Sequence, residues 1–394
     1  VETSAQPVSD SAWLIHVEPL DEWTTQLGVD FDVESQCQVK GFYVTEKNLL
    51  GRGLRLSFRY RDFRERNDRS VTLSTGRFLG TRANASVAAG TTRTGSFFRQ
   101  ELTYPFVSEA GRFSLESRLQ FEDREYSYLT GDHGGISHVL LPLQDVEGTL
   151  RVARRYGQPG ALALVGAEIE LLHREVSAPA RQVVRGDFDR AATAPDSLAG
   201  RLAAQDVPDS FLRAGAIVGV RRLRFTTARG LDRVSGEQNV ALGSELLLTV
   251  GRTLGTWGTS PNDTYGKVDG FLGAAMGAVT ATAALLAEGR HVDQAPAGVS
   301  LWRDLLLRGR ALAYVQPGGS TAQTSVAGVR FNVRGNVDQP YQVALGGEEG
   351  VRSYREDEVP TGSSFVAYAE HRINLSWFKP AMDMGITVFG DVGR

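Results

Sequence analysis

Three charged residues near the carboxyl end of the sequence could act together: Arg352, Glu370 and Asp391. Arg352 lies in a glycine-rich stretch, and the two acids lie on the polar sides of the two segments that follow it. A guanidinium group between two carboxylates makes charge-assisted hydrogen bonds and keeps both acids ionised. We expect a loop that folds back so that Arg352 meets both acids; the pattern alone leaves open that all three are solvated surface charges.

The sequence contains none of the common catalytic or metal-binding motifs. It has no serine-nucleophile, zinc-protease or phosphate-loop pattern. Its one cysteine, Cys37, allows no internal disulfide and no thiolate metal cluster. Glu370 and Asp391 could form a catalytic pair in principle, but an arginine between them favours an ion-pair network. We therefore predict a protein that is not an enzyme and that uses no cofactor and no metal.

The segments that carry the two acids alternate in polarity as β-strands do. Residues 363–375 place Phe365 and Ile373 on one face and Glu370 and Arg372 on the other. Residues 381–393 behave in the same way: Met382, Met384, Ile386, Val388 and Val392 oppose Asp383, Thr387 and Asp391. Side chains in a strand point alternately to its two faces, so each segment has one apolar face and one polar face.

The sharpest alternation lies near the start of the chain. One face of residues 54–61 carries Leu54, Leu56, Phe58 and Tyr60, and the other carries Arg55, Ser57, Arg59 and Arg61. Three arginines on one face cannot point into a soluble core without partners. They can point into a water-filled lumen while the apolar face meets lipid, where an arginine at mid-depth costs about 2–4 kcal/mol. The pattern predicts a transmembrane strand with its arginines inside.

Similar segments recur along the chain and give about sixteen strands, or more. They tend towards the 9–11 residues of a tilted membrane strand rather than the five or six of a soluble sandwich. The uncharged stretch 270–287 is rich in Gly, Ala and Thr, and we interpret it as a hairpin of two strands rather than a membrane helix. We expect long loops at 126–145 and 177–211, the second with a short helix at Ser197–Ala204. The predicted fold is all-β, a transmembrane antiparallel β-barrel.

Composition narrows the class of protein further. The chain has 43 Lys and Arg against 46 Asp and Glu, so its net charge of −3 does not suggest a nucleic-acid partner. The abundance of glycine, 44 residues, fits a large all-β protein. No secretion signal is visible, and the start is typical of a mature or truncated chain. We expect residues 1–23 to be the end of a periplasmic domain and residues 24–394 to be the barrel.

The loop and the two strands after it resemble the BamA/TamA-like outer-membrane assembly family, also known as the bacterial surface antigen family. The family has an LGG…VRGY loop, then a strand with Glu-x-Arg, then a strand with Phe-x-Asp-x-Gly. The matching loop residues here are Gly346, Gly347, Val351, Arg352, Ser353 and Tyr354, with Ser353 where the family has glycine. The matching wall residues are Glu370, Arg372, Phe389, Asp391 and Gly393. The NLLGRG turn, residues 48–53, is similar to the family's first barrel strands.

The resemblance implies a location, a function and a set of partners. It places the chain in the outer membrane of a Gram-negative-type bacterium, in contact with lipid, with the loop arginine in the lumen on the two acids. The implied function is insertion of β-barrel proteins into that membrane, or export of protein across it. The implied partners are unfolded β-barrel or secreted substrates, with periplasmic domains or accessory lipoproteins. Two alternatives stay open: a passive porin-like channel, and the membrane anchor of a larger lipid-processing protein.

The resemblance also implies a weak seam between the first and last strands, where a substrate strand would pair. The first strand is expected at residues 24–34, and its edge residues are Thr24, Gln26, Gly28 and Asp30. The family places Phe-x-Asp-x-Gly about three strands before its end, whereas only Arg394 follows that motif here. We therefore expect that the strands that close the barrel are not part of this sequence.

Overall fold

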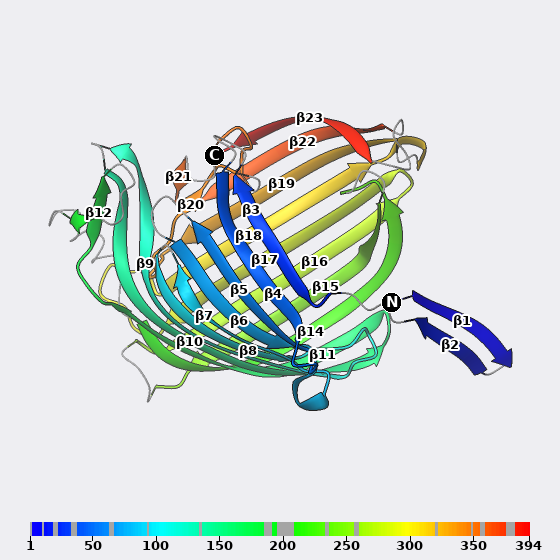
Figure 1. The fold of residues 1–394 in the computed structure, drawn as a ribbon. Helices are drawn as coiled ribbons and strands as arrows, with labels where there is room; N and C mark the ends of the chain where they lie inside the picture. Colours follow the sequence, from blue (N-terminus) through cyan, green and yellow to red (C-terminus); the bar gives the residue numbers. More distant parts are fainter. Residues whose placement is uncertain are drawn as a thin grey trace.

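Figure 1 shows the fold, a computed structural model in which 77% of the described residues are in strands. It describes residues 2–9, 12–18, 23–32, 38–62, 67–92, 94–133, 136–184, 191–194, 209–232, 236–255, 260–319, 322–347, 350–354, 359–375 and 383–394. Within these ranges, none of the helices has the length and apolar character needed to cross a membrane. The prediction of an all-β chain is confirmed.

One large antiparallel sheet forms the wall of the molecule. Its first strands are β3 (Thr25–Asp32), β4 (Gln38–Leu49), β5 (Leu54–Asp62), β6 (Asn67–Thr75), β7 (Asn84–Thr92), β8 (Gly95–Tyr104), β9 (Phe113–His133), β10 (Ile136–Gln158) and β11 (Ala161–Val176). It continues through β14 (Asp209–Arg229), β15 (Glu237–Thr253), β16 (Asp263–Met276), β17 (Val279–Val292), β18 (Trp302–Val315), β19 (Gln323–Gly335), β22 (Ser364–Leu375) and β23 (Met384–Gly393). Among the described residues, the short strands β12 (Arg181–Val184) and β13 (Ala192–Thr193) bring the sheet to 19 strands, in line with the prediction of about sixteen or more.

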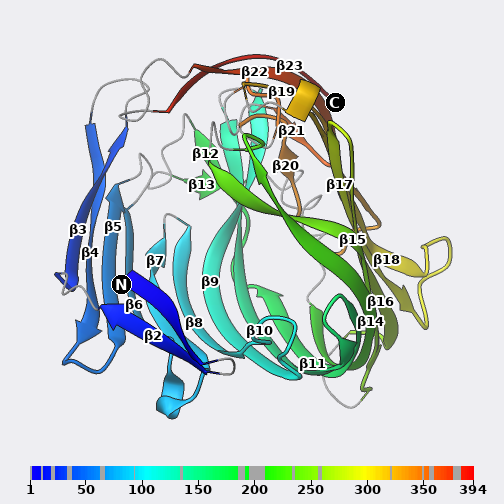
Figure 2. The same cartoon turned by 90° about the vertical axis from the view of Figure 1, so that its right-hand side faces the viewer.

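The wall strands follow one another round a ring in which β3 comes next to β23 (Figure 2). Each paired neighbour is antiparallel, from β3 with β4 to β22 with β23, so the two end strands run in the same direction. Among the described residues, a defined register joins every neighbouring pair of wall strands except β3 and β23. The seam of the ring therefore lies between the first and last wall strands, and the need for further closing strands stays a prediction.

The two ends of the ring differ. The end where β3 begins carries short connections, such as Gly277–Ala278 between β16 and β17, and we call it the turn end. The other end carries the longer connections after β11 and β19, and we call it the loop end. A separate hairpin, β1 (Glu2–Ser9) with β2 (Ala12–Glu18), lies beyond the turn end in Figure 1. The uncharged stretch 270–287 falls on β16 and β17, as the hairpin interpretation predicted.

The loop predicted at 126–145 is wrong, because β9 and β10 run through most of it. Tyr128 pairs with Val139 and Tyr126 with Leu141, so the two strands extend well past their neighbours. Glycines and histidines interrupt the alternation of polar and apolar residues where β9 and β10 meet, so the sequence did not indicate strands there. The extension packs against the segment after β11 through buried Val139, Leu141, Leu143, Ala180 and Ala194. The predicted loop 177–211 contains β12 and β13, and the helix expected at Ser197–Ala204 lies outside the described residues.

The register assigns each strand face to the lumen or to the outside. Arg59 on β5 is level with Ser70 on β6, and the same row continues to Asp145 on β10 and Arg174 on β11. Asp145 and Arg174 form an ion pair of 2.6 Å with both side chains buried. The opposite row carries exposed apolar side chains, among them Phe58, Val71 and Phe98. The arginines of β5 therefore lie inside and its apolar side chains outside, as predicted.

A candidate lumen site

The segment between β19 and β22, residues 336–363, is the lumen loop. It forms a small sheet of its own, β20 (Val343–Ala344) with β21 (Pro360–Thr361). Its tip is fixed by backbone hydrogen bonds: the Val351 amide donates to the Leu345 carbonyl at 2.6 Å, and the Gly347 amide to the Tyr354 carbonyl at 3.1 Å. Leu345 and Val351 pack on Val366 of β22 in a buried apolar cluster. This packing holds the next residue, Arg352, against the wall.

Arg352 bonds to both acids that the sequence singled out. Its Nε donates to Asp391 Oδ2 at 2.8 Å and its Nη2 to Asp391 Oδ1 at 2.5 Å, a bidentate pair. Its Nη1 donates to Glu370 Oε1 at 2.8 Å, and its backbone amide also donates to Asp391 Oδ2 at 3.1 Å. The side chains of Asp391 and Glu370 are only 4% and 8% exposed. The loop tip therefore supplies the charge that both acids need in a site with little water.

Aromatic rings complete the arginine's surroundings. The guanidinium lies 3.9 Å from the ring centroid of Phe389 and 5.7 Å from that of Tyr368. Phe389 belongs to the same strand as Asp391, and its ring stacks against one face of the guanidinium. Hydrogen bonds to Asp391 and Glu370 raise the pKa of Arg352 further above its usual range. Arg352 is therefore a permanent cation whose position the wall fixes on several sides.

The loop departs from the family pattern at Ser353 without backbone strain. Positive φ angles occur at five described non-glycine residues, and Ser353 is not among them. Gly347, in contrast, has φ of 83°, in the left-handed region that favours glycine. Tyr354 of the same motif is exposed, at 44%. Serine is thus compatible with the tip conformation seen here.

Arg372 joins the same site from the far side of Glu370. Its Nε donates to Glu370 Oε2 at 2.8 Å, so Glu370 lies between two arginines. Its Nη1 donates to the carbonyl oxygen of Leu231, which belongs to the turn between β14 and β15. Arg372 was predicted as a wall residue, but no sequence signal connected it to Leu231, which is 141 positions away.

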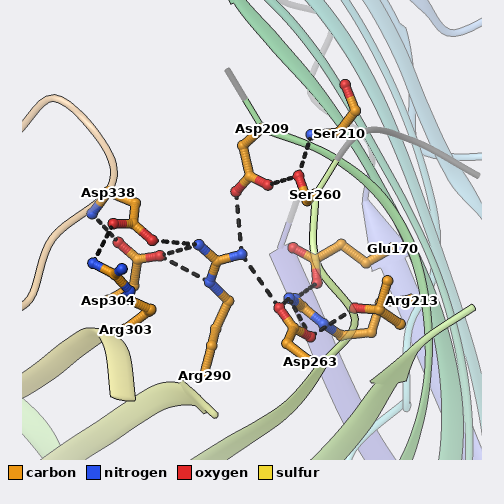
Figure 3. A network of polar contacts seen from close by, with 11 residues as sticks. Glu170, Asp209, Ser210, Arg213, Ser260, Asp263, Arg290, Arg303, Asp304 and Asp338 are labelled. Atoms are coloured by element: carbon orange, nitrogen blue, oxygen red, sulfur yellow. Dashed lines mark hydrogen bonds and ion pairs between the residues drawn. The ribbon is translucent and has the colours of Figure 1, made fainter. Parts of the chain in front are cut away.

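The start of the lumen loop has a second attachment, drawn in Figure 3. Asp338 accepts a hydrogen bond from Arg303 Nη1 at 3.0 Å and from Arg290 Nη2 at 3.4 Å. The Asp338 amide donates to Asp304 Oδ1 at 2.9 Å. Burial and the nearby charge of Asp304 raise the pKa of the Asp338 carboxyl group. The loop is therefore held at its root by β17 and β18 as well as at its tip.

Arg290 is the centre of this second cluster. Besides Asp304, which accepts from its Nε at 2.8 Å, it lies 3.2 Å from both Asp209 and Asp263. Asp263 is 1% exposed and also accepts from Arg213 Nη2 at 3.1 Å. Figure 3 shows these side chains converging from β14, β16, β17 and β18. The sequence did not predict this cluster, since its members share no motif; acids near the starts of the alternate strands β14, β16 and β18 were the one available signal.

A third contact ties the lumen loop to the extension of β9. The Gln342 side chain accepts from the Leu129 amide at 2.7 Å and donates to the Leu129 carbonyl at 3.0 Å. Leu129 belongs to the part of β9 that extends past β8, across the ring from β19 and β22, so the loop bridges the opening at the loop end. This pair was also missed, since a lone glutamine in a loop gives no sequence signal.

The predicted first-strand edge lies on and just before β3. The Thr24 carbonyl accepts from the Lys47 amide at 2.9 Å, and the Tyr43 ring covers Gly28 so closely that a Cβ there would lie 2.1 Å from it. Gln26 and Asp30 share the lumen side with Gly28. No hydrogen bond or ion pair described joins these residues to Arg352. Nor do the described residues include a His, Cys, Asp and Glu cluster suited to a metal ion.

No protein-family model matches the sequence, and no curated protein does. Among solved structures, the chain is similar to BamA from Haemophilus ducreyi lacking POTRA domains 1-3. That likeness has a TM-score of 0.40 and 9% identity, and covers 99% of this chain and 75% of that one. It is also similar to CdiB from Acinetobacter baumannii, with a TM-score of 0.36 and 7% identity, over 93% of this chain and 65% of that one.

Proposed function

We propose that the chain is an outer-membrane β-barrel of the BamA/TamA-like type, which inserts β-barrel proteins into the membrane or exports protein across it. The observation that carries the proposal is the bidentate bond of Arg352 to Asp391 with its further bond to Glu370. These are the residues that match the family's loop and wall motifs. Short connections at one end and long ones at the other are typical of outer-membrane barrels, so the turn end would face the periplasm.

The geometry supports a passage that is controlled rather than permanently open. The lumen loop bridges the opening at the loop end and is attached at Asp338, Gln342 and Arg352. A passive pore has no need of a loop held by three separate polar contacts. The seam between β3 and β23 supplies an edge that an unfolded substrate strand could extend by backbone pairing.

The proposal is tested by reconstituting the chain in lipid vesicles and adding an unfolded outer-membrane β-barrel. The readout is the rate at which that substrate becomes resistant to protease and to heat in gel electrophoresis. We expect faster folding than in empty vesicles and a loss of the gain with Arg352→Ala. The matched control is Arg77→Ala, an exposed arginine in the turn before β7. Equal folding rates with and without the chain would exclude insertion. An assay of protein translocation across the same vesicle membrane would then test export.

A further inference from the structure

The hairpin of β14 and β15 leaves the barrel wall before it ends. Pairing of β11 with β14 stops at Leu162 with Arg221, and pairing of β15 with β16 starts at Gly243 with Gly273. Beyond these points the two strands pair only with each other, as far as Arg229 with Glu237. We call this free part, residues 222–242, the mouth hairpin. Figure 2 shows it crossing the opening of the barrel at the turn end.

Two glycines mark the place where the mouth hairpin turns inward. Gly243 has φ of 116°, and a Cβ there would lie 2.0 Å from the Arg222 carbonyl oxygen. A Cβ on its partner Gly273 would lie 2.2 Å from the Ala241 carbonyl oxygen. Neither position accepts a side chain without a shift of the backbone. The bend is therefore built into the sequence at a defined register.

The exposure of β15 side chains shows that its outer face turns to the interior past the bend. Leu246 and Val250 point outward from the wall and are 50% and 47% exposed. Val240 and Leu242 belong to the same alternating face but are 7% and 6% exposed. They pack with Tyr314 and Val326, which lie in the same row as Glu370 on the lumen side.

The tip of the mouth hairpin is fastened to three wall strands. Leu231 is 2% exposed within that apolar cluster. Asp232 accepts a hydrogen bond from the Tyr314 hydroxyl at 2.6 Å, and the Gly230 carbonyl accepts from Thr324 Oγ1 at 2.8 Å. Arg372 of β22 donates to the Leu231 carbonyl. A surface turn has no need of buried apolar and polar contacts with strands that are far away in the sequence.

We propose that the mouth hairpin is a second stopper of the lumen, at the turn end, and that it is coupled to the lumen loop through Arg372. Arg372 holds the hairpin by one nitrogen and Glu370 by another, and Glu370 holds Arg352. A movement of either the lumen loop or the mouth hairpin therefore changes the hydrogen-bond partners of Glu370. The role of the mouth hairpin as a stopper does not depend on the proposed function. Only its coupling to the lumen loop rests on that function.

The test is ion conductance of the purified chain in planar lipid bilayers, with four proteins: wild type, Arg352→Ala, Leu231→Asp and the double variant. Leu231→Asp places a charge in the apolar cluster and releases the tip. If two stoppers close the lumen in series, each single variant should raise the conductance by a small factor over the wild type. The double variant should raise it by more than the product of those two factors. The matched control is Leu79→Asp, since Leu79 is 85% exposed in another turn at the same end.

The outcomes separate the two ideas. If the double variant conducts no more than Arg352→Ala alone, the mouth hairpin closes nothing and the proposal fails. If Leu231→Asp alone conducts as much as the double variant, the hairpin is a stopper but the lumen loop is not. Resistance of the folded barrel to heat in gels shows that each variant is intact. Tyr314→Phe, which removes only the bond to Asp232, provides a milder release if Leu231→Asp does not fold, and unchanged conductance in the Arg352→Ala background would then reject the proposal.

Discussion

Val351 of the lumen loop packs directly on Gly393 of β23: a Cβ at Gly393 would lie 2.6 Å from Val351 Cγ2. Both residues flank the ion pair of Arg352 with Asp391, so their contact sets how deeply the arginine enters the wall. Glycine at position 393 provides the space that the loop tip occupies.

We expect Gly393→Ala to push the loop tip away from β23 and to weaken the bonds of Arg352. Overpacking of this kind costs about 1–3 kcal/mol. Val351→Ala in the same chain should restore the fit, so the double variant should regain insertion activity. Hydrogen exchange at residues 350–354, recorded at increasing temperature, measures how much the docking of the loop tip is weakened. An activity of the double variant no higher than that of Gly393→Ala would contradict the packing argument.

Arg352→Lys should retain only part of the activity of the wild type. Lysine carries the charge but cannot make the bidentate bond to Asp391 while it also reaches Glu370. Complete removal, in Arg352→Ala, leaves the buried Asp391 carboxylate without its bidentate partner and Glu370 with Arg372 alone, and costs about 3 kcal/mol in the loop-docked state. Insertion activity in vesicles should decrease in the order wild type, Arg352→Lys, Arg352→Ala. A lysine variant as active as the wild type would show that charge alone is sufficient.

Spin labels test the orientation of β5. Cysteines placed at Leu56 and Arg59, in a Cys37→Ser background, carry the label to opposite faces of the strand. Oxygen, which dissolves in lipid, should broaden the spectrum of the label at 56, and a water-soluble nickel complex should broaden that at 59. The reverse result would mean that the strand register is shifted by one residue.

The attachment of Asp338 should not weaken under mild acid. Its pKa is raised in the folded loop, so the folded state binds a proton more tightly than the unfolded state. Stability therefore rises as pH falls from neutral through the raised pKa and levels off below the ordinary value of about 4. Hydrogen-exchange protection at residues 336–342 should be equal or greater at pH 5 than at pH 7. Asp338→Asn should abolish the difference, and a loss of protection at pH 5 in the wild type would refute the sign.

The fold could be predicted because alternation is a local property. Arg55 to Arg61 reveal a lumen face within eight residues, and the register in the structure puts them there. Residues 126–145 misled the prediction, since glycine and histidine interrupt the alternation where β9 and β10 extend past the wall. Pairing between strands, and hence the position of the seam, depends on contacts that no short stretch of sequence specifies.

The same distinction applies to the candidate site. Arg352, Glu370 and Asp391 could be paired in advance because they fall on consecutive elements that resemble a known motif. The cluster around Arg290 collects acids from positions 209, 263, 304 and 338, and only the folded ring brings them together. The mouth hairpin was missed for a related reason. Its strands alternate in the ordinary way, and only the bend at Gly243 redirects one face.

The fastening of the mouth hairpin also determines the order in which the chain can be assembled. Asp232 bonds to Tyr314, which is 82 positions later in the chain, and Leu231 bonds to Arg372, which is 141 positions later. Contacts between such distant positions form late, because the intervening chain must first be ordered. The tip can dock only after β18, β19 and β22 have joined the sheet. A newly made barrel therefore passes through a stage in which its wall is complete and its mouth is still open, and closure of the mouth marks the end of its maturation.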